Sequence, residues 1–130
     1  MTLQPASGAR DLNPQQVRKN HLIASKLSSL YQLWGYERIS PPHIERLDTL
    51  MAAGGISNNE ILKIVSDEPL GLRPEITASI VRAASTRFNE YERPLRFWST
   101  GTSFKCNQSI DGGIDIEESF QSGVELIGTK

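Results

Sequence analysis

One segment constrains most strongly what this chain can fold into, because it predicts a strand that leads directly into a helix: Leu70-Gly71-Leu72-Arg73-Pro74-Glu75-Ile76-Thr77. The residue before a proline is pushed out of the helical region, so Arg73 should be extended. Pro74 suits the first position of a helix, where a missing N–H costs nothing. We therefore predict a strand over 70–73 and a helix from Pro74 to about Asn89.

The start of this predicted helix carries two polar side chains, Glu75 and Thr77. A carboxylate and a hydroxyl placed there could bind a small ligand with an ammonium group. The alternative is that Glu75 only stabilises the first turn by its charge. Arg73, just before them, either reaches an anionic ligand or forms an internal salt bridge. The helix should bury an apolar stripe made of Ile76, Ile80, Ala83 and Ala84.

Composition excludes several classes of function. Fourteen basic and fifteen acidic residues among 130 give a net charge of −1, which provides no overall attraction to nucleic acid or to an anionic membrane. Cys106 is the single cysteine and there are two histidines, so neither a disulfide framework nor a zinc site is expected. No run approaches the ~20 apolar residues of a membrane span. We expect a soluble cytoplasmic protein of one domain, with no metal and no cofactor.

The first long element is a helix that begins at Asn13-Pro14 and ends at Gly35. Asparagine is a good N-cap, and proline suits the first helical position. Trp34 and Trp98 are both expected to be core aromatics. The buried face of this helix is predicted from spacings of four, three and four residues, at Ile23, Leu27, Leu30 and Trp34.

The middle of the chain predicts short elements separated by turns. We expect a strand over 36–40 that is interrupted by Pro41-Pro42 and continues through 43–45. A short helix over 46–53 should be closed by Gly54-Gly55. The apolar run over 61–65 predicts another strand, followed by a turn at 66–69.

The last third of the chain predicts a hairpin. Residues 94–105 are rich in aromatic and β-branched side chains, Asp111-Gly112-Gly113 indicates the turn, and 118–127 should return as a strand. Alternation along that returning strand places Gln121, Gly123 and Glu125 on one face, and Phe120, Val124 and Leu126 on the other. The polar face is either a platform for a ligand or an ordinary solvent face.

These elements predict an α+β fold in which an antiparallel sheet carries flanking helices over 13–35 and 74–89. The predicted sheet has a face with no helix left to cover it. We therefore expect residues 1–130 to be one domain that is part of a larger one, or a sheet completed by a second copy.

Three motifs, in order, resemble the catalytic core of class II histidyl-tRNA synthetases: Gly35-Tyr36 leading to Pro41-Pro42-His43-Ile44-Glu45, then Leu72-Arg73-Pro74-Glu75-Ile76-Thr77, then Gln121-Ser122-Gly123-Val124-Glu125. The opening 3–12 and the phrase 47–52 are more similar to the non-aminoacylating relatives of those enzymes, the regulatory subunits of ATP phosphoribosyltransferase. The resemblance covers nearly the whole chain and implies the N-terminal part of a class II synthetase-like domain.

The resemblance implies a binding site for histidine. In the synthetases, the glutamate and threonine of the Arg-Pro-Glu-x-Thr motif bind the substrate histidine, and they correspond to Glu75 and Thr77. The glutamine and glutamate of the Gln-x-Gly-Val-Glu strand line the same pocket and correspond to Gln121 and Glu125.

The chain departs from the enzyme pattern in its second class II motif. Where the synthetases have an arginine after an aromatic residue, this chain has Lys105 after Phe104. Lysine lacks the planar fork with which arginine binds carboxylate or phosphate. The loop that should be basic carries four acids, which would repel a triphosphate and an RNA end: Asp111, Asp115, Glu117 and Glu118. We therefore expect neither adenylation nor aminoacylation.

Two functions follow from the resemblance. The first is a non-catalytic regulatory subunit that assembles with the catalytic subunit of ATP phosphoribosyltransferase for the first step of histidine biosynthesis, with histidine feedback acting through the degenerate pocket. The second is a fragment of a histidyl-tRNA synthetase. A third, purely structural reading is that the chain only dimerises through the strand around 39–44, the region that forms the subunit interface in class II folds. That role is compatible with the first.

Overall fold

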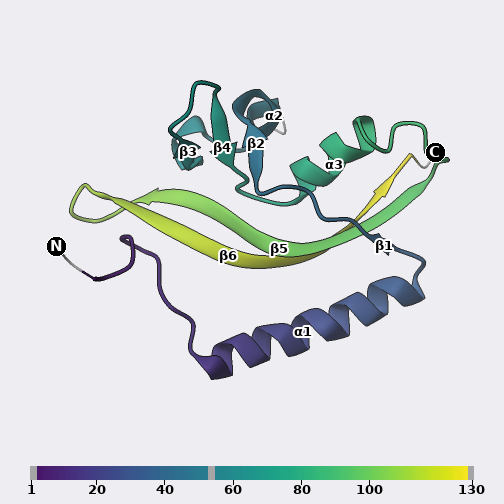
Figure 1. Cartoon of the computed structure of the whole chain (residues 1–130), viewed down its shortest axis with the longest axis horizontal. Coiled ribbons are helices and arrows are strands. Elements are labelled where there is room, and N and C mark those ends of the chain that lie inside the picture. The colour runs from purple at the N-terminus through teal and green to yellow at the C-terminus, as the bar shows by residue number, and fades with distance from the viewer. Residues whose placement is uncertain (1–2, 53–54, 129–130) are drawn as a thin grey trace.

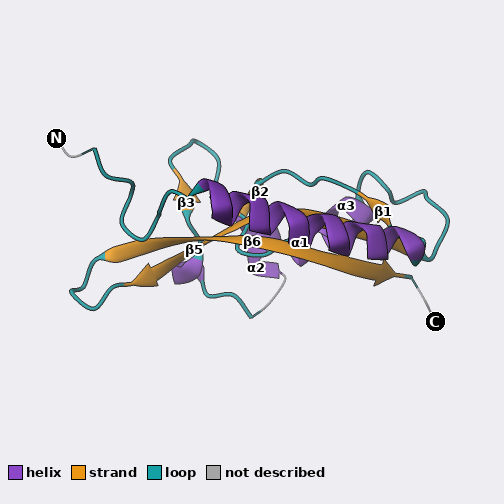
Figure 2. Cartoon of the chain, turned by 90° about the horizontal axis from the view of Figure 1, so that it is seen from below, coloured by secondary structure: helices purple, strands orange, loops and turns teal. Residues whose placement is uncertain are grey.

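In the computed structural model, which describes residues 3–52 and 55–128, helices cover both sides of a long two-stranded ribbon (Figure 1). Helix α1 lies along one side, while α3 and a smaller sheet lie on the other (Figures 1 and 2). The helices are α1 (Pro14–Leu33), α2 (Leu47–Ala52), η1 (Asn58–Glu60) and α3 (Thr77–Ser85). The strands are β1 (Glu37–Arg38), β2 (Ile44–Arg46), β3 (Lys63–Ile64), β4 (Leu70–Leu72), β5 (Leu95–Gln108) and β6 (Ile114–Ile127).

The strands form two three-stranded sheets, in the orders β1-β5-β6 and β2-β4-β3. The β5–β6 pair is antiparallel over its full length, from Leu95 opposite Ile127 to Gln108 opposite Ile114. This confirms the α+β class and the predicted hairpin. Strands were predicted in all these regions, but their division into two sheets and the parallel pairing of β1 with β5 were not, because local patterns do not show which strands pair. The prediction that the strand over 36–40 continues through 43–45 is wrong, since β1 and β2 belong to different sheets.

Helix α1 begins and ends as predicted, but none of its residues is fully buried, and only Leu27 of its predicted buried face is half-buried. The Asn13 and Gln16 side chains cap each other's backbone N–H groups in a capping box, and Gly35 follows the helix with φ +80°. The prediction that Trp34 is a core aromatic is wrong, because this side chain is 73% exposed. Ile23 and Leu30 are also about half exposed, at 48% and 49%.

The rotation of α1 is set by Tyr31. Its ring packs against Trp98, with centroids 5.6 Å apart, and its hydroxyl lies 3.2 Å from Ser122 Oγ. Ala24, Leu27 and Ser28 are half-buried on the same side of the helix, whereas Ile23 and Leu30 are exposed. Trp98, which is 4% exposed, is the core aromatic that the sequence predicted.

Helix α3 is shorter than predicted at both ends. It begins at Thr77 rather than Pro74, because the Glu75 carboxylate accepts hydrogen bonds from the backbone N–H groups of Thr77 and Ala78, at 2.8 and 3.0 Å. A side chain that satisfies these donors lets the preceding backbone remain non-helical. The helix ends at Ser85, and turns occupy the residues up to 90.

The predicted apolar stripe of α3 forms the centre of the core. Ile76, Ile80, Ala83 and Ala84 are 2–6% exposed, and the core cluster that includes Ile76, Ile80 and Ala84 is completed by Leu95 and Phe97 of β5. This packing fixes α3 against one face of the β5–β6 ribbon.

Several short elements differ from their predicted bounds. Strand β1 covers two residues, β3 covers only Lys63–Ile64, and Val65 is fully exposed. Helix α2 begins at Leu47, and Gly55 has φ +72°, as a helix-closing glycine does. Ala53 and Gly54, at the predicted end of that helix, lie outside the described residues.

The N-terminal lead-in docks on the outer edge of β6. The Ile116 N–H donates to the Ser7 carbonyl at 2.7 Å, and the Ser7 hydroxyl donates to the Asp115 carboxylate. Gly8 has φ +87°, and a Cβ added there would overlap the Ile116 backbone. Only glycine meets both requirements without strain.

We predict that Gly8→Ala destabilises the chain more than Gly112→Ala. Both glycines have φ +87°, but a Cβ at Gly112, in the hairpin turn, meets nothing within 4 Å. Alanine at Gly112 should cost about 1 kcal/mol for the left-handed backbone alone, whereas at Gly8 it must also displace the docked turn. Urea unfolding with amide exchange at Ile116 measures the difference. Equal costs would show that the docking contributes nothing.

Candidate functional site

The structure brings the four predicted histidine-site residues together on the α3 side of the sheet. Thr77 Oγ1 donates to Glu125 Oε1 at 2.8 Å. Glu75, Thr77, Gln121 and Gly123 line one pocket of about 410 Å³, whereas Glu125 adjoins it through its hydrogen bond to Thr77 and is not one of the lining residues. Carboxylate, hydroxyl and amide groups therefore converge on a small open space, which suits a ligand that carries an ammonium group.

The β5–β6 register explains why β6 presents these residues. Gly101 lies opposite Gln121, Ser99 opposite Gly123 and Phe97 opposite Glu125. Residues directly opposite each other share a face, so this face has small or buried side chains on β5 and polar ones on β6. The sequence predicted the polar face correctly, and the packing of α3 over it supplies the second wall.

Glu75 has a structural role that the sequence left as an alternative. Oε2 accepts from Thr77 N and Oε1 from Ala78 N, so both carboxylate oxygens cap α3. An ionised carboxylate has about four lone-pair positions, and two backbone donors leave capacity for an ammonium group. Capping and ligand binding are therefore compatible in one side chain.

A second hollow shares Glu75 and Thr77 with the first. It measures about 690 Å³ and is also lined by Thr49, Val81 and Arg82. Arg82 Nε lies 2.8 Å from Glu45 Oε2, and Glu45 is 5% exposed. This ion pair, in which Glu45 is buried and Arg82 is 30% exposed, was not predicted, because the sequence around Glu45 shows only a short strand.

Arg73 follows neither of the two roles considered for it. Its side chain is 2% exposed and donates from Nε to the Thr102 carbonyl at 3.0 Å and from Nη1 to the Pro41 carbonyl at 3.1 Å. Burial lowers the pKa of this guanidinium, and the charge of Glu45 offsets part of that shift. Arg73 therefore bonds backbone carbonyls rather than a ligand or a carboxylate.

Lys105 is not part of this pocket. Lys105 and Gly101 lie on the same face of β5, but Lys105 is four residues further along the strand, a separation of roughly 13 Å. Its cross-strand partner is Glu117, which accepts a hydrogen bond from Asn107 Nδ2 at 2.7 Å. At the hairpin tip, a hydrogen bond from Ser109 lowers the pKa of Asp111. The predicted acids therefore surround the end of the hairpin.

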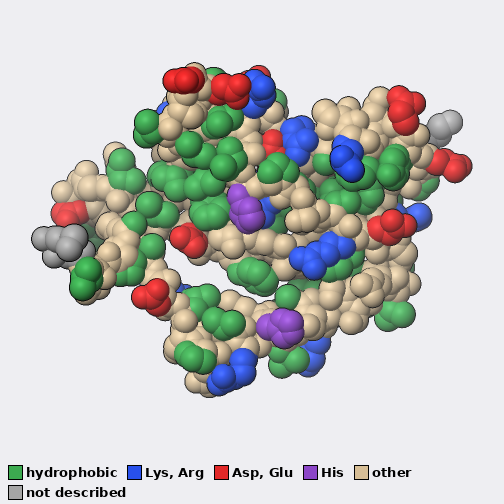
Figure 3. All heavy atoms as spheres, in the orientation of Figure 1, with side chains coloured by type: hydrophobic (Ala, Val, Ile, Leu, Met, Phe, Trp, Pro, Cys, Tyr) green, Lys and Arg blue, Asp and Glu red, His purple; other side chains and the backbone are tan. Residues whose placement is uncertain are grey.

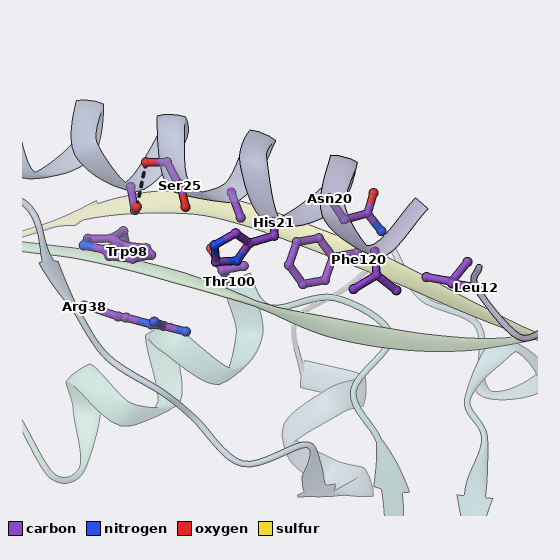
Figure 4. Close-up of a pocket in the computed structure, with 11 residues that line it drawn as sticks. Leu12, Asn20, His21, Ser25, Arg38, Trp98, Thr100 and Phe120 are labelled. Carbon is purple, nitrogen blue, oxygen red and sulfur yellow. Dashed lines mark hydrogen bonds between the residues drawn. The ribbon is translucent and has the colours of Figure 1, made fainter. Parts of the chain in front are cut away.

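A different hollow, missed by the sequence, lies under α1 on the opposite face of the sheet. Figure 3 shows the gap between α1 and the rest of the molecule, and Figure 4 shows the aromatic rings of Trp98 and Phe120 along it. Its volume is about 460 Å³, and Arg38 lies 5.1 Å from the centre of the Trp98 ring. None of the four predicted histidine-site residues lines it.

Within residues 3–52 and 55–128, no three His, Cys, Asp or Glu side chains are arranged to hold a metal ion. The same part of the chain contains no helix that is long and apolar enough to cross a membrane.

Comparison with known proteins identifies the family. The family model described as histidyl-tRNA synthetase matches residues 8–130. The chain belongs to the histidyl-tRNA synthetase family. It is 98% identical over 130 residues to a protein of Prochlorococcus marinus strain NATL1A named ATP phosphoribosyltransferase regulatory subunit. It is 63% identical over 128 residues to a protein of the same name from Prochlorococcus marinus strain SARG.

A solved structure of this family has the same fold. The crystal structure of an ATP phosphoribosyltransferase regulatory subunit/histidyl-tRNA synthetase from Bacillus halodurans aligns with a TM-score of 0.87 at 27% identity. The alignment covers 99% of this chain and 33% of that one. The chain likewise spans about a third of the curated relatives, since it covers 33% of each of the two Prochlorococcus proteins.

We predict that Glu75→Ala destabilises the chain by about 1 kcal/mol, because two amides of α3 lose their acceptor. Glu75→Gln should cost less, since the amide oxygen can still accept from one of them. Urea unfolding measures both variants. Equal losses for alanine and glutamine would contradict the capping role.

Proposed function

We propose that this chain is the N-terminal part of a non-catalytic regulatory subunit of ATP phosphoribosyltransferase. In this proposal it assembles with a separate catalytic subunit and supports the first step of histidine biosynthesis in the cytoplasm. The observation that carries the proposal is the 98% identity, over the whole chain, to a protein with that name.

The charges of the hairpin support the non-catalytic part of the proposal. A synthetase must hold a triphosphate and an RNA end, both of which are anionic. Here the end of the hairpin carries Asp111, Asp115, Glu117 and Glu118, and Lys105 has its cross-strand position opposite one of these acids. Like charges at this position repel both substrates.

Histidine is the ligand that we propose for the Glu75–Thr77 pocket. Its α-ammonium would bind the two carboxylates, Glu75 and Glu125, while Thr77 and Gln121 fix its orientation by hydrogen bonds. A regulatory subunit that binds the pathway's end product can transmit feedback to its catalytic partner, provided that histidine binds one state of the complex more tightly than the other.

The test is calorimetric titration of histidine into the full-length subunit, with and without its catalytic partner. We expect binding in the wild type and a loss of at least about tenfold in affinity for Glu125→Gln, because a charged hydrogen bond to the ammonium is removed. Glu75→Gln retains an oxygen that can cap α3 but loses the negative charge, so its affinity for histidine should also fall. Asp115→Asn, at the hairpin end, is the matched control and should bind normally.

Two results would contradict parts of this proposal. If the subunit binds its catalytic partner but never histidine, feedback is sensed elsewhere and the domain serves as a scaffold. If the intact protein binds ATP with histidine and forms the adenylate, the protein is a histidyl-tRNA synthetase. That second function is favoured by the description of the matching family model.

We also propose a homodimer through the region around 39–44. Ile39 packs against the core, whereas Ile44 on β2 is 47% exposed. An exposed apolar side chain on an edge strand, here Ile44 on β2, suits a self-complementary contact.

We predict that Ile44→Lys weakens this dimer by at least about tenfold, because two like charges would meet at the symmetric contact. Val65→Lys is the matched control, since Val65 is fully exposed in the turn next to the same small sheet. Sedimentation velocity measures both. A dimer that is unaffected by Ile44→Lys would place the interface elsewhere.

A further inference from the structure

Arg73 joins three segments of the chain at the start of α3. Its backbone N–H donates to the His43 carbonyl and its own carbonyl accepts from Phe104 N–H, both at 2.9 Å. Its side chain adds bonds to the carbonyls of Pro41, Pro42 and Thr102, at 3.1, 3.5 and 3.0 Å. These contacts attach the segment before β2 and the middle of β5 to the residues that lead into α3.

The guanidinium lies where β5 has no side chain. A Cβ added at Gly101 would overlap Arg73 Nη2, so glycine is what makes room for the cation. Gly101 is also directly opposite Gln121 in the β5–β6 ladder. The guanidinium is therefore packed against β5 directly across the ladder from Gln121, which lines the candidate pocket.

The position of Arg73 in the chain connects it to the site. It lies two residues before Glu75 and four before Thr77, and Pro74 between them stiffens the backbone. The hydrogen bond of 2.8 Å between Thr77 and Glu125 requires α3 to start at a fixed height above β6. The bonds of Arg73 to β5 supply that constraint, because β5 and β6 are paired along their whole length.

We propose that Arg73 is a positioning residue for the Glu75–Thr77 site, and that Gly101 leaves the space on the sheet that its guanidinium occupies. The guanidinium donates to backbone carbonyls of β5 and of the segment before β2. It holds the two walls of the pocket, the start of α3 and the β5–β6 ribbon, in register. The identity of the ligand rests on the proposed function, whereas the positioning itself can be tested without any ligand.

The first test is hydrogen exchange measured by mass spectrometry on the full-length subunit, for Arg73→Lys and Gly101→Ala. In Arg73→Lys, lysine keeps the charge but lacks the planar guanidinium that reaches several carbonyls. In Gly101→Ala, the added methyl group displaces the guanidinium from its position on β5. We expect exchange in peptides that contain Thr77 and Ala78 to be about tenfold faster, with little change in α1. If Arg73→Lys does not fold, Gly101→Ala alone decides the result.

Leu27→Ala is the matched control, because it removes a half-buried side chain from α1 on the opposite face of the sheet. It should lower overall stability without selectively exposing the start of α3. If Arg73→Lys and Gly101→Ala alter exchange no more locally than Leu27→Ala does, the positioning role is overturned and Arg73 is only a general stabiliser.

The second test is histidine titration of the same variants. Misplacing one wall of the pocket should weaken histidine binding by about tenfold or more for Arg73→Lys and Gly101→Ala, while Leu27→Ala retains wild-type affinity. Unchanged affinity in the Arg73 and Gly101 variants would overturn the inference. A wild-type protein that binds no histidine would instead refute the proposed ligand, and the exchange result would still decide the role of Arg73.

Discussion

The pairing of β5 with β6 determines which side chains can meet in this protein. Because the two strands remain in register from Leu95–Ile127 to Gln108–Ile114, each residue of one strand has a fixed partner and a fixed face. One face receives α3 and the polar residues Gln121 and Glu125. The other receives α1 and the aromatic ring of Trp98. The two helices never compete for the same surface, and a shift of one residue in this register would exchange every contact.

The start of α3 is held from two directions. Glu75 caps the helix from its own chain, and Arg73 ties the preceding residues to β5 and to the segment before β2. A carboxylate that already accepts two backbone hydrogen bonds has a fixed orientation, so a ligand that binds it does not have to order the side chain. The same side chain can therefore stabilise the start of α3 and also contribute to a pocket.

Strong local signals in the sequence predicted most of the elements correctly. Three features that depend only on neighbouring residues are found as predicted: the start of α1 at Asn13-Pro14, the long strand β5, and the face of β6 that carries polar side chains. Tertiary contacts decided the rest. The apolar spacing at Ile23, Leu27, Leu30 and Trp34 predicted a buried face, but only Leu27 of the four is half-buried. The contact with the core is made instead by Tyr31, whose ring packs on Trp98. The contact of the Arg73 guanidinium with Gly101 joins residues 28 positions apart, and no local pattern in the sequence indicates it.

The two tryptophans occupy opposite environments. Trp98 is covered by Tyr31 and Arg38, whereas Trp34, just past the end of α1, is 73% exposed. Indole fluorescence shifts to longer wavelength in water, so the emission of this chain has a blue component from Trp98 and a red component from Trp34. Lifting α1 from the sheet would uncover Trp98 and leave Trp34 as it is. The docking of that helix therefore has its own optical signal, with an internal reference in the same molecule.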